Sequence, residues 1–173
     1  MNIKIASEPA EFDQIHRINY KTFVQEIPQH KENEQAMLVD RFHDKNTYVI
    51  AKRDEQVIGM VCFNLSRPFS LDEKLPDLET YLPPFHKLAE IRLLAVLPEE
   101  RMTIITYKLL HQLALTLMSL QVDAGVICGY QKQLHLYQHI GFIPFGPVVG
   151  SGEALYQPMY ITLKELFNGF RSN

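Results

Sequence analysis

Cysteine is scarce in this sequence, and long hydrophobic runs are missing. Only Cys62 and Cys128 occur among the 173 residues, each inside an apolar stretch, so neither a disulfide framework nor a zinc site is expected. No run approaches the roughly 20 apolar residues of a membrane helix, and the first residues lack the apolar stretch of a secretory signal. These absences predict a cytoplasmic protein with reduced thiols and no membrane partner.

An excess of charge of one sign is also missing. The sequence has 17 Lys and Arg residues against 20 Asp and Glu, which gives a net charge of −3. Domains that bind nucleic acid usually carry a basic face, so nucleic acid is not expected as a partner. With 46% apolar and 21% charged residues, the composition is that of an ordinary globular protein. At roughly 150 residues per domain, the length predicts a single domain over residues 1–173.

The hydrophobic pattern predicts a mixed α/β (α+β) domain with a mixed sheet, in the order β-α-α-β-β-β-α-β-α-β-β. A strand at 88–96, a long apolar-striped helix at 101–120 and a strand at 123–128 should form a right-handed crossover between parallel strands. The other expected strands are 3–5, 47–51, 57–65, 142–145 and 155–163. The other expected helices are 11–24, 34–42 and 131–140, with a last helical turn at 164–170.

Residues 66–87 interrupt this pattern with four prolines and four acidic residues. A loop of about twenty residues is unusual in a compact domain and often serves as a lid or a binding segment. A tolerated surface insertion that contains a helical turn is the alternative, and the sequence does not separate the two.

Three stretches of the second half carry a resemblance to a known family. They are residues 89–98 (Ala-Glu-Ile-Arg-Leu-Leu-Ala-Val-Leu-Pro), 100–110 (Glu-Arg-Met-Thr-Ile-Ile-Thr-Tyr-Lys-Leu-Leu) and 136–142 (Leu-Tyr-Gln-His-Ile-Gly-Phe). In order and spacing they resemble the fourth strand, the pyrophosphate loop with its helix, and the helix-turn-strand of the GNAT N-acyltransferases. The resemblance implies the GNAT fold and the transfer of an acetyl or longer acyl group from acetyl-CoA or another acyl-CoA to a small-molecule amine.

The first half is similar to one branch of the same fold. Residues 20–26 and 40–42 resemble the acyl-homoserine-lactone synthases and the N-acyl amino acid synthases, which take long acyl chains from acyl carrier protein. Arginines that are common in that branch are replaced near Asn19 and Asn64. The resemblance therefore adds acyl carrier protein as a possible donor and partner, and the chain is expected to act as a monomer or a homodimer.

Donor binding is expected along the strand at 88–96 and the loop that follows it. Unpaired main-chain groups of Leu94, Ala95 and Val96 would bind the amides of a pantetheine arm as another strand would. The orphan N–H groups of a helix's first turn suit a pyrophosphate, and Arg101 is the adjacent cation. That first turn is expected to comprise Met102, Thr103, Ile104, Ile105 and Thr106.

Two residues of this loop depart from the family. Ile104 and Thr106 occupy positions where the family usually has glycine or another small residue, and a side chain there crowds a phosphate unless it turns into the core. Three alternatives stay open: a coenzyme A donor, an acyl carrier protein that presents a single phosphate, and a catalytically silent GNAT-like binding or regulatory module.

Two side chains are candidates for catalysis. Glu90 would take the proton of the attacking ammonium, directly or through water, and Tyr137 would protonate the departing thiolate. The alternatives are an ion pair of Glu90 with Arg92 on the same strand face, and an ordinary half-buried aromatic at 137. No metal is expected, because His135 and His139, although spaced for one helix face, have no evident third ligand.

Overall fold

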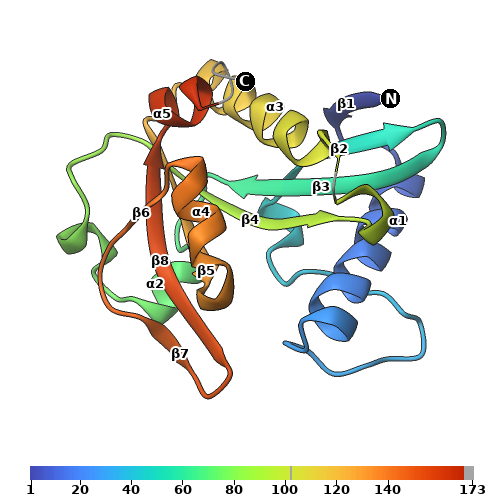
Figure 1. The fold of residues 1–173 in the computed structure, drawn as a ribbon, viewed down its shortest axis with the longest axis horizontal. Helices are drawn as coiled ribbons and strands as arrows, with labels where there is room; N and C mark the ends of the chain where they lie inside the picture. The colour runs from blue at the N-terminus through green and yellow to red at the C-terminus, as the bar shows by residue number, and fades with distance from the viewer. Residues whose placement is uncertain (102, 170–173) are drawn as a thin grey trace. The chain divides into compact units, whose positions relative to one another are not determined.

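The computed structural model describes residues 1–101 and 103–169 and is drawn in Figure 1. Its internal contacts divide the chain into two compact units. The first unit contains Met1–Phe63 and Leu93–Leu113, and the second contains Asn64–Arg92 and the chain from Ala114 onward. The prediction of a single domain over residues 1–173 stays a prediction.

An antiparallel sheet and one long helix build the first unit. Strands β1 (Asn2–Ile5), β2 (Thr47–Arg53) and β3 (Gln56–Asn64) pair in the order β1-β2-β3. Helix α1 (Pro9–Tyr20) packs Ile15 and Ile18 against Tyr48, Ile50 and Met60 of the sheet. Pro9 lies in the first turn, where a missing N–H costs nothing. The helix continues as a π-helical turn over Lys21–Glu26.

The helix predicted at 34–42 is wrong. This segment forms turns, followed by a 3₁₀ turn at His43–Lys45. Local side-chain hydrogen bonds account for the difference, because Asn and Asp offer the backbone an alternative to helical bonding. The Asn33 carboxamide bonds both the N–H and the carbonyl of Met37, and the Asp40 carboxylate accepts from the Phe42 N–H. Met37 and Leu38 are consequently only half-buried.

The second unit contains the parallel pair that the sequence predicts. Strand β4 (Leu88–Val96) pairs in parallel with β5 (Ala124–Tyr130), and β5 pairs antiparallel with β8 (Ala154–Thr162). Two short strands, β6 (Ile143–Pro144) and β7 (Val149–Ser151), both pair with β8, and β7 was not predicted. The parallel pairing of β4 with β5 is therefore confirmed.

The helices of the second half follow the predicted order. Helix α3 (Ile105–Ser119) begins four residues later than expected, after a 3₁₀ turn at Pro98–Glu100. Helix α4 (Leu134–Ile140) follows another 3₁₀ turn and ends at Gly141, whose φ of 115° is the left-handed conformation of a helix C-terminus. Helix α5 (Leu163–Asn168) comes directly after β8.

Residues 66–87 are folded onto the second unit. They contain helix α2 (Ser70–Lys74) and a 3₁₀ turn at Leu78–Tyr81, so the segment has the helical turn that one of the two alternatives included. Phe69, Leu71, Leu75 and Leu78 form one buried cluster with Val126 and Phe145. Across the described part of the chain, no helix has both the length and the apolar character needed to span a lipid bilayer.

Candidate active site

The ladder between β4 and β5 is short. The register pairs Leu88, Ala89 and Glu90 with Ala124, Gly125 and Val126, although β5 continues as far as Tyr130. Leu93 adopts a φ of 56°, a left-handed conformation that costs a residue with a Cβ about 1–2 kcal/mol. The regular part of β4 that pairs with β5 therefore ends before Leu93.

The predicted pantetheine partners lie at the end of β4, in the first unit. Ala95 and Val96 are buried and Leu94 is half-buried, and Ala95 belongs to the core cluster of α1 and the sheet. The carbonyl of Val96 accepts a hydrogen bond of 2.9 Å from Nε of Arg101. One of the expected donor-binding groups therefore already has a partner within the chain.

Arg101 is also held by an acidic residue. Its Nη2 lies 2.5 Å from Oε2 of Glu26, the last residue of the π-helical turn. Both side chains are substantially exposed to solvent, so this ion pair is weak and can open. A thioester donor with a phosphate would compete with Glu26 for the same guanidinium.

The loop before α3 closes on itself. The Thr103 hydroxyl donates to the carbonyl of Glu100 at 2.6 Å and accepts from the N–H of Ile105 at 3.3 Å. Thr103 thus satisfies one orphan N–H of the helix that was expected to bind phosphate. Ile104 is 60% exposed, so its side chain does not turn into the core, and Thr106 is half-buried. Met102 lies outside the described residues.

Glu90 is fully enclosed in the second unit. It is 1% exposed, and its carboxylate accepts three hydrogen bonds from the start of α2. The donors are the N–H of Ser70 at 3.0 Å, the hydroxyl of Ser70 at 2.9 Å and the N–H of Leu71 at 2.8 Å. Arg92 adds an ion pair of 3.6 Å. These contacts favour the ion-pair alternative over a general base, because both oxygens are already engaged.

Tyr137 lies on α4 over the backbone of β5. A Cβ added at Gly129 would come within 3.1 Å of its ring, and the ring meets Phe142 edge-on at 6.3 Å. Its hydroxyl donates to Oε1 of Gln133 at 3.3 Å. Burial raises the pKa of Tyr137, and the neighbouring Cys128 raises it further. The phenol is therefore protonated at neutral pH and able to donate its proton.

Cys128 precedes Gly129 on β5, and the burial of its thiol disfavours the thiolate form that a nucleophile needs. Burial raises the pKa of its thiol; Lys74 and Arg92 act in the opposite direction, and Glu90 raises it. A thiol with a raised pKa carries little thiolate at neutral pH. Within residues 1–101 and 103–169, no cluster of three or more His, Cys, Asp or Glu side chains is arranged to hold a metal ion.

The sequence did not indicate the partners of Glu90. Ser70 and Leu71 lie about twenty positions away, in a segment that the pattern left irregular. One signal was available: Phe69 precedes α2 and has no side-chain acceptor, so the first N–H groups of that helix need a partner from elsewhere.

Comparison with known proteins assigns this chain to a family. The profile described as N-acyl amino acid synthase FeeM matches residues 14–161. No curated protein sequence matches this chain. Among solved structures, a CoA-dependent acyl-homoserine lactone synthase, BjaI, with SAM and isopentyl-CoA is similar with a TM-score of 0.81 and 16% identity, over 98% of this chain and 88% of that chain.

Two further solved structures are similar to this chain with lower TM-scores. FeeM, an N-acyl amino acid synthase from uncultured soil microbes, has a TM-score of 0.74 and 16% identity over 95% of this chain and 91% of that chain. An aminoglycoside 6′-N-acetyltransferase complexed with coenzyme A has a TM-score of 0.66 and 12% identity over 94% and 97%. The predicted GNAT-like fold with a mixed sheet is confirmed.

The family profile extends from the middle of α1 to the end of β8 and so includes both candidate catalytic residues. It confirms the resemblance to the N-acyl amino acid synthase branch, and it favours acyl transfer over the catalytically silent alternative. The chain belongs to the FeeM family of N-acyl amino acid synthases and is an N-acyltransferase that transfers an acyl group to an amine acceptor.

Proposed function

We propose that the protein transfers an acyl group from a phosphopantetheine thioester to the α-amino group of an amino acid. The match of the family profile to residues 14–161 carries this proposal. The acceptor class follows from the name of that family, and the short β4–β5 ladder supports a pantetheine arm as part of the donor.

The donor is either acyl-CoA or acyl carrier protein, which share the phosphopantetheine arm. The CoA-dependent lactone synthase among the similar structures supports the first. The loop before α3 supports the second, because Ile104 and Thr106 stand where small residues favour a diphosphate and because Thr103 already satisfies the Ile105 N–H. A donor with one phosphate needs fewer of these groups than coenzyme A does.

The reaction needs few groups from the protein. The neutral amine attacks the thioester carbon, a C–N bond forms and the C–S bond breaks, and binding both substrates side by side supplies much of the acceleration. The departing thiolate takes a proton from Tyr137, whose raised pKa keeps it protonated until then, and the proton that the attacking nitrogen loses as the amide forms restores the phenol. The proton of the ammonium leaves to water, since both oxygens of Glu90 are engaged with Ser70 and Leu71.

The test is a panel of amino acids assayed with acyl-CoA and acyl carrier protein thioesters of several chain lengths, with detection of the free thiol and of the N-acyl product by mass. We expect an N-acyl amino acid with at least one donor. Tyr137→Phe should lower kcat by about 10²-fold, the lower end of the range for acid–base assistance. The proposal fails if every pair of donor and amino acid is inert while an amine of another class is acylated.

Arg101→Ala tests whether Arg101 contacts the donor phosphate. If Arg101 leaves Glu26 to contact a donor phosphate, the KM of that donor should rise about tenfold, as expected for loss of one charge-assisted hydrogen bond. Glu26→Gln is the matched variant, and it should lower the same KM because it frees the guanidinium. An unchanged KM in both variants would remove Arg101 from the donor site.

A further inference from the structure

The N-cap residue of helix α2 offers no side-chain acceptor to the first N–H groups of the helix, and the Asp72 carboxylate accepts from the N–H of Phe69 instead. The N-cap is Phe69, in an extended conformation with φ −76° and ψ 163°, and a phenyl ring accepts no hydrogen bond from the N–H groups that follow. The first N–H groups of a helix have no partner within the helix, so they must find an acceptor elsewhere or remain costly. Here the residues concerned are Ser70, 6% exposed, and Leu71, 0% exposed.

Glu90 supplies the missing acceptor from β4. One carboxylate oxygen accepts from the Ser70 N–H, and the other accepts from the Ser70 hydroxyl and the Leu71 N–H, at 2.8 to 3.0 Å. The negative charge also lies at the positive end of these aligned peptide groups. All of these atoms are within the second unit.

The contact fastens the first half of segment 66–87. Directly beside Ser70, the side chains of Phe69 and Leu71 enter the buried cluster that includes Val126 of β5. On the exposed side, Arg67 pairs with Asp72 and Glu79. The segment is therefore attached at its first half by one buried carboxylate and by apolar packing.

The point of attachment is next to the place where the strands stop pairing. Glu90 and Val126 form the last pair of the β4–β5 register, and Arg92 forms an ion pair with Glu90. Cys128 of β5 packs against the same buried cluster as Phe69 and Leu71, and the ring of Tyr137 lies over the next residue, Gly129. A displacement of α2 would therefore disturb the packing beside the candidate acid.

We propose that Glu90 is a positioning residue that caps α2 and fixes segment 66–87 as a wall of the active site, and that it does not exchange protons with the substrates. This inference rests on the proposed function, because it assigns the segment a part in substrate binding. It differs from the general-base hypothesis in what it predicts for Glu90→Gln and Ser70→Ala.

Glu90→Gln keeps the shape of the side chain but presents an N–H₂ group to one of the N–H donors at the start of α2. We expect Glu90→Gln to raise the KM of the acyl donor or of the amino acid about tenfold, by loss of a charge-assisted hydrogen bond. The kcat should stay within a few-fold of the wild type. The pH profile of kcat should keep its shape. Ser70→Ala, which removes only the hydroxyl donor, should change KM in the same direction by a smaller factor.

Hydrogen–deuterium exchange of peptides that cover 66–75 gives a readout independent of turnover. We expect faster exchange in Glu90→Gln and in Ser70→Ala, and wild-type exchange in the control Glu73→Gln, which changes an exposed carboxylate of the same helix. If exchange is faster in both variants but the wild-type protein acylates no amino acid, the role of Glu90 in holding segment 66–87 is retained and the proposed function is overturned.

The inference is overturned by the opposite pattern. A loss of kcat of about 10²-fold or more in Glu90→Gln, with a changed pH profile and unchanged exchange at 66–75, would make Glu90 a general base. Unchanged kinetics and unchanged exchange in both variants would show that the contact fixes nothing. If Glu90→Gln does not fold, Ser70→Ala decides the question by the same two measurements.

Discussion

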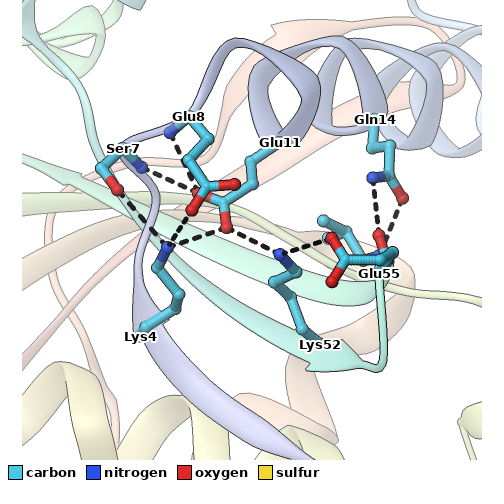
Figure 2. Close-up of polar contacts among 8 residues, drawn as sticks. Lys4, Ser7, Glu8, Glu11, Gln14, Lys52 and Glu55 are labelled. Carbon is cyan, nitrogen blue, oxygen red and sulfur yellow. Dashed lines mark hydrogen bonds and ion pairs between the residues drawn. The ribbon is translucent and has the colours of Figure 1, made fainter.

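The buried carboxylate of Glu11 is the best place to test the electrostatics of the first unit. Glu11 lies in the first turn of α1 and is 1% exposed. Figure 2 shows the donors gathered around it: Nζ of Lys4 at 2.8 Å, Nζ of Lys52 at 3.1 Å, and the N–H groups of Ser7 at 2.9 Å and Glu8 at 3.2 Å. The side chain thereby joins β1, α1 and β2.

Glu11→Gln is the informative change, because it keeps the volume and removes the charge. Two lysines then face a buried neutral group, and removing one partner of a buried ion pair costs about 3–5 kcal/mol. The side chains of Lys4 and Lys52 are 26% and 11% exposed, so we expect the lower end, about 3 kcal/mol. At about 2–4 °C per kcal/mol for a chain of this size, Tm should fall by about 6–12 °C.

The pH dependence follows from the same contacts. Burial alone would raise the pKa of Glu11, but the hydrogen bonds from Lys4, Ser7, Lys52 and Glu8 outweigh it and lower the pKa from 4.5 to about 2. The unfolded chain therefore takes up this proton at a higher pH than the folded one. The stabilisation is complete above pH 4.5 and is lost as the pH falls towards 2.

Urea unfolding of the wild type and of Glu11→Gln between pH 7 and pH 3 measures how the stabilisation by Glu11 depends on pH. The stability gap between wild type and Glu11→Gln should be widest at pH 7 and should narrow below pH 4.5. Glu8→Gln is the matched control in the same turn, since its carboxylate is 58% exposed and lies 3.6 Å from Lys4; it should cost less than about 1 kcal/mol. Equal losses in the two variants, or a gap independent of pH, would refute the reasoning.

Three further predictions concern other residues. His16 is buried and its Nδ1 has no hydrogen-bond partner among the described residues; burial, and then the nearby His43, lower its pKa below 6.5, while Asp13 acts against them. The unfolded state therefore protonates first, and His16→Leu should lessen the loss of stability below pH 6.5, which urea titrations at pH 7 and pH 5 would detect. Gly150 has a φ of 98°, and a Cβ there would lie 2.0 Å from the carbonyl oxygen of Ala154; Gly150→Ala should cost about 3 kcal/mol, against about 1 kcal/mol for Gly152→Ala, where nothing lies within 4 Å, and equal Tm values for the two would contradict this. Cys62 is 0% exposed, so iodoacetamide at pH 7.5 should modify it only at the rate of unfolding, whereas Cys128 is half-buried with a thiol pKa raised by burial and should react slowly in the native protein; rapid modification of Cys62 in the native protein would contradict its burial.

Regular patterns were enough to predict most strands and helix ends. The largely apolar stretch 88–96 predicted β4 with its observed bounds, and Gly141 marked the end of α4 because few other residues take its conformation. Strand β7 was missed because Val149, Gly150 and Ser151 carry no alternation, and this short strand is defined only by its pairing with β8.

The site shows where such patterns stop being informative. Glu90 was recognisable as a polar residue within an apolar strand, but its partners come from Ser70 and Leu71, in a segment without periodicity. The side-chain hydrogen bonds of Asn33 and Asp40 that prevent a helix at 34–42 likewise cannot be predicted from the spacing of apolar residues. Contacts of this kind depend on the folded backbone, whereas periodicity reports only which face of an element is covered.

The attachment of segment 66–87 bears on the engineering of the enzyme. Its first half is held by Glu90 and by Phe69 and Leu71, whereas Glu79, Thr80 and Tyr81 are exposed at a turn flanked by prolines on both sides. Prolines limit the conformations available to the flanking chain. A library randomised at these three positions would therefore vary the outer surface of the segment on a fixed base, and selection from it could yield variants with new substrate preferences without rebuilding the core.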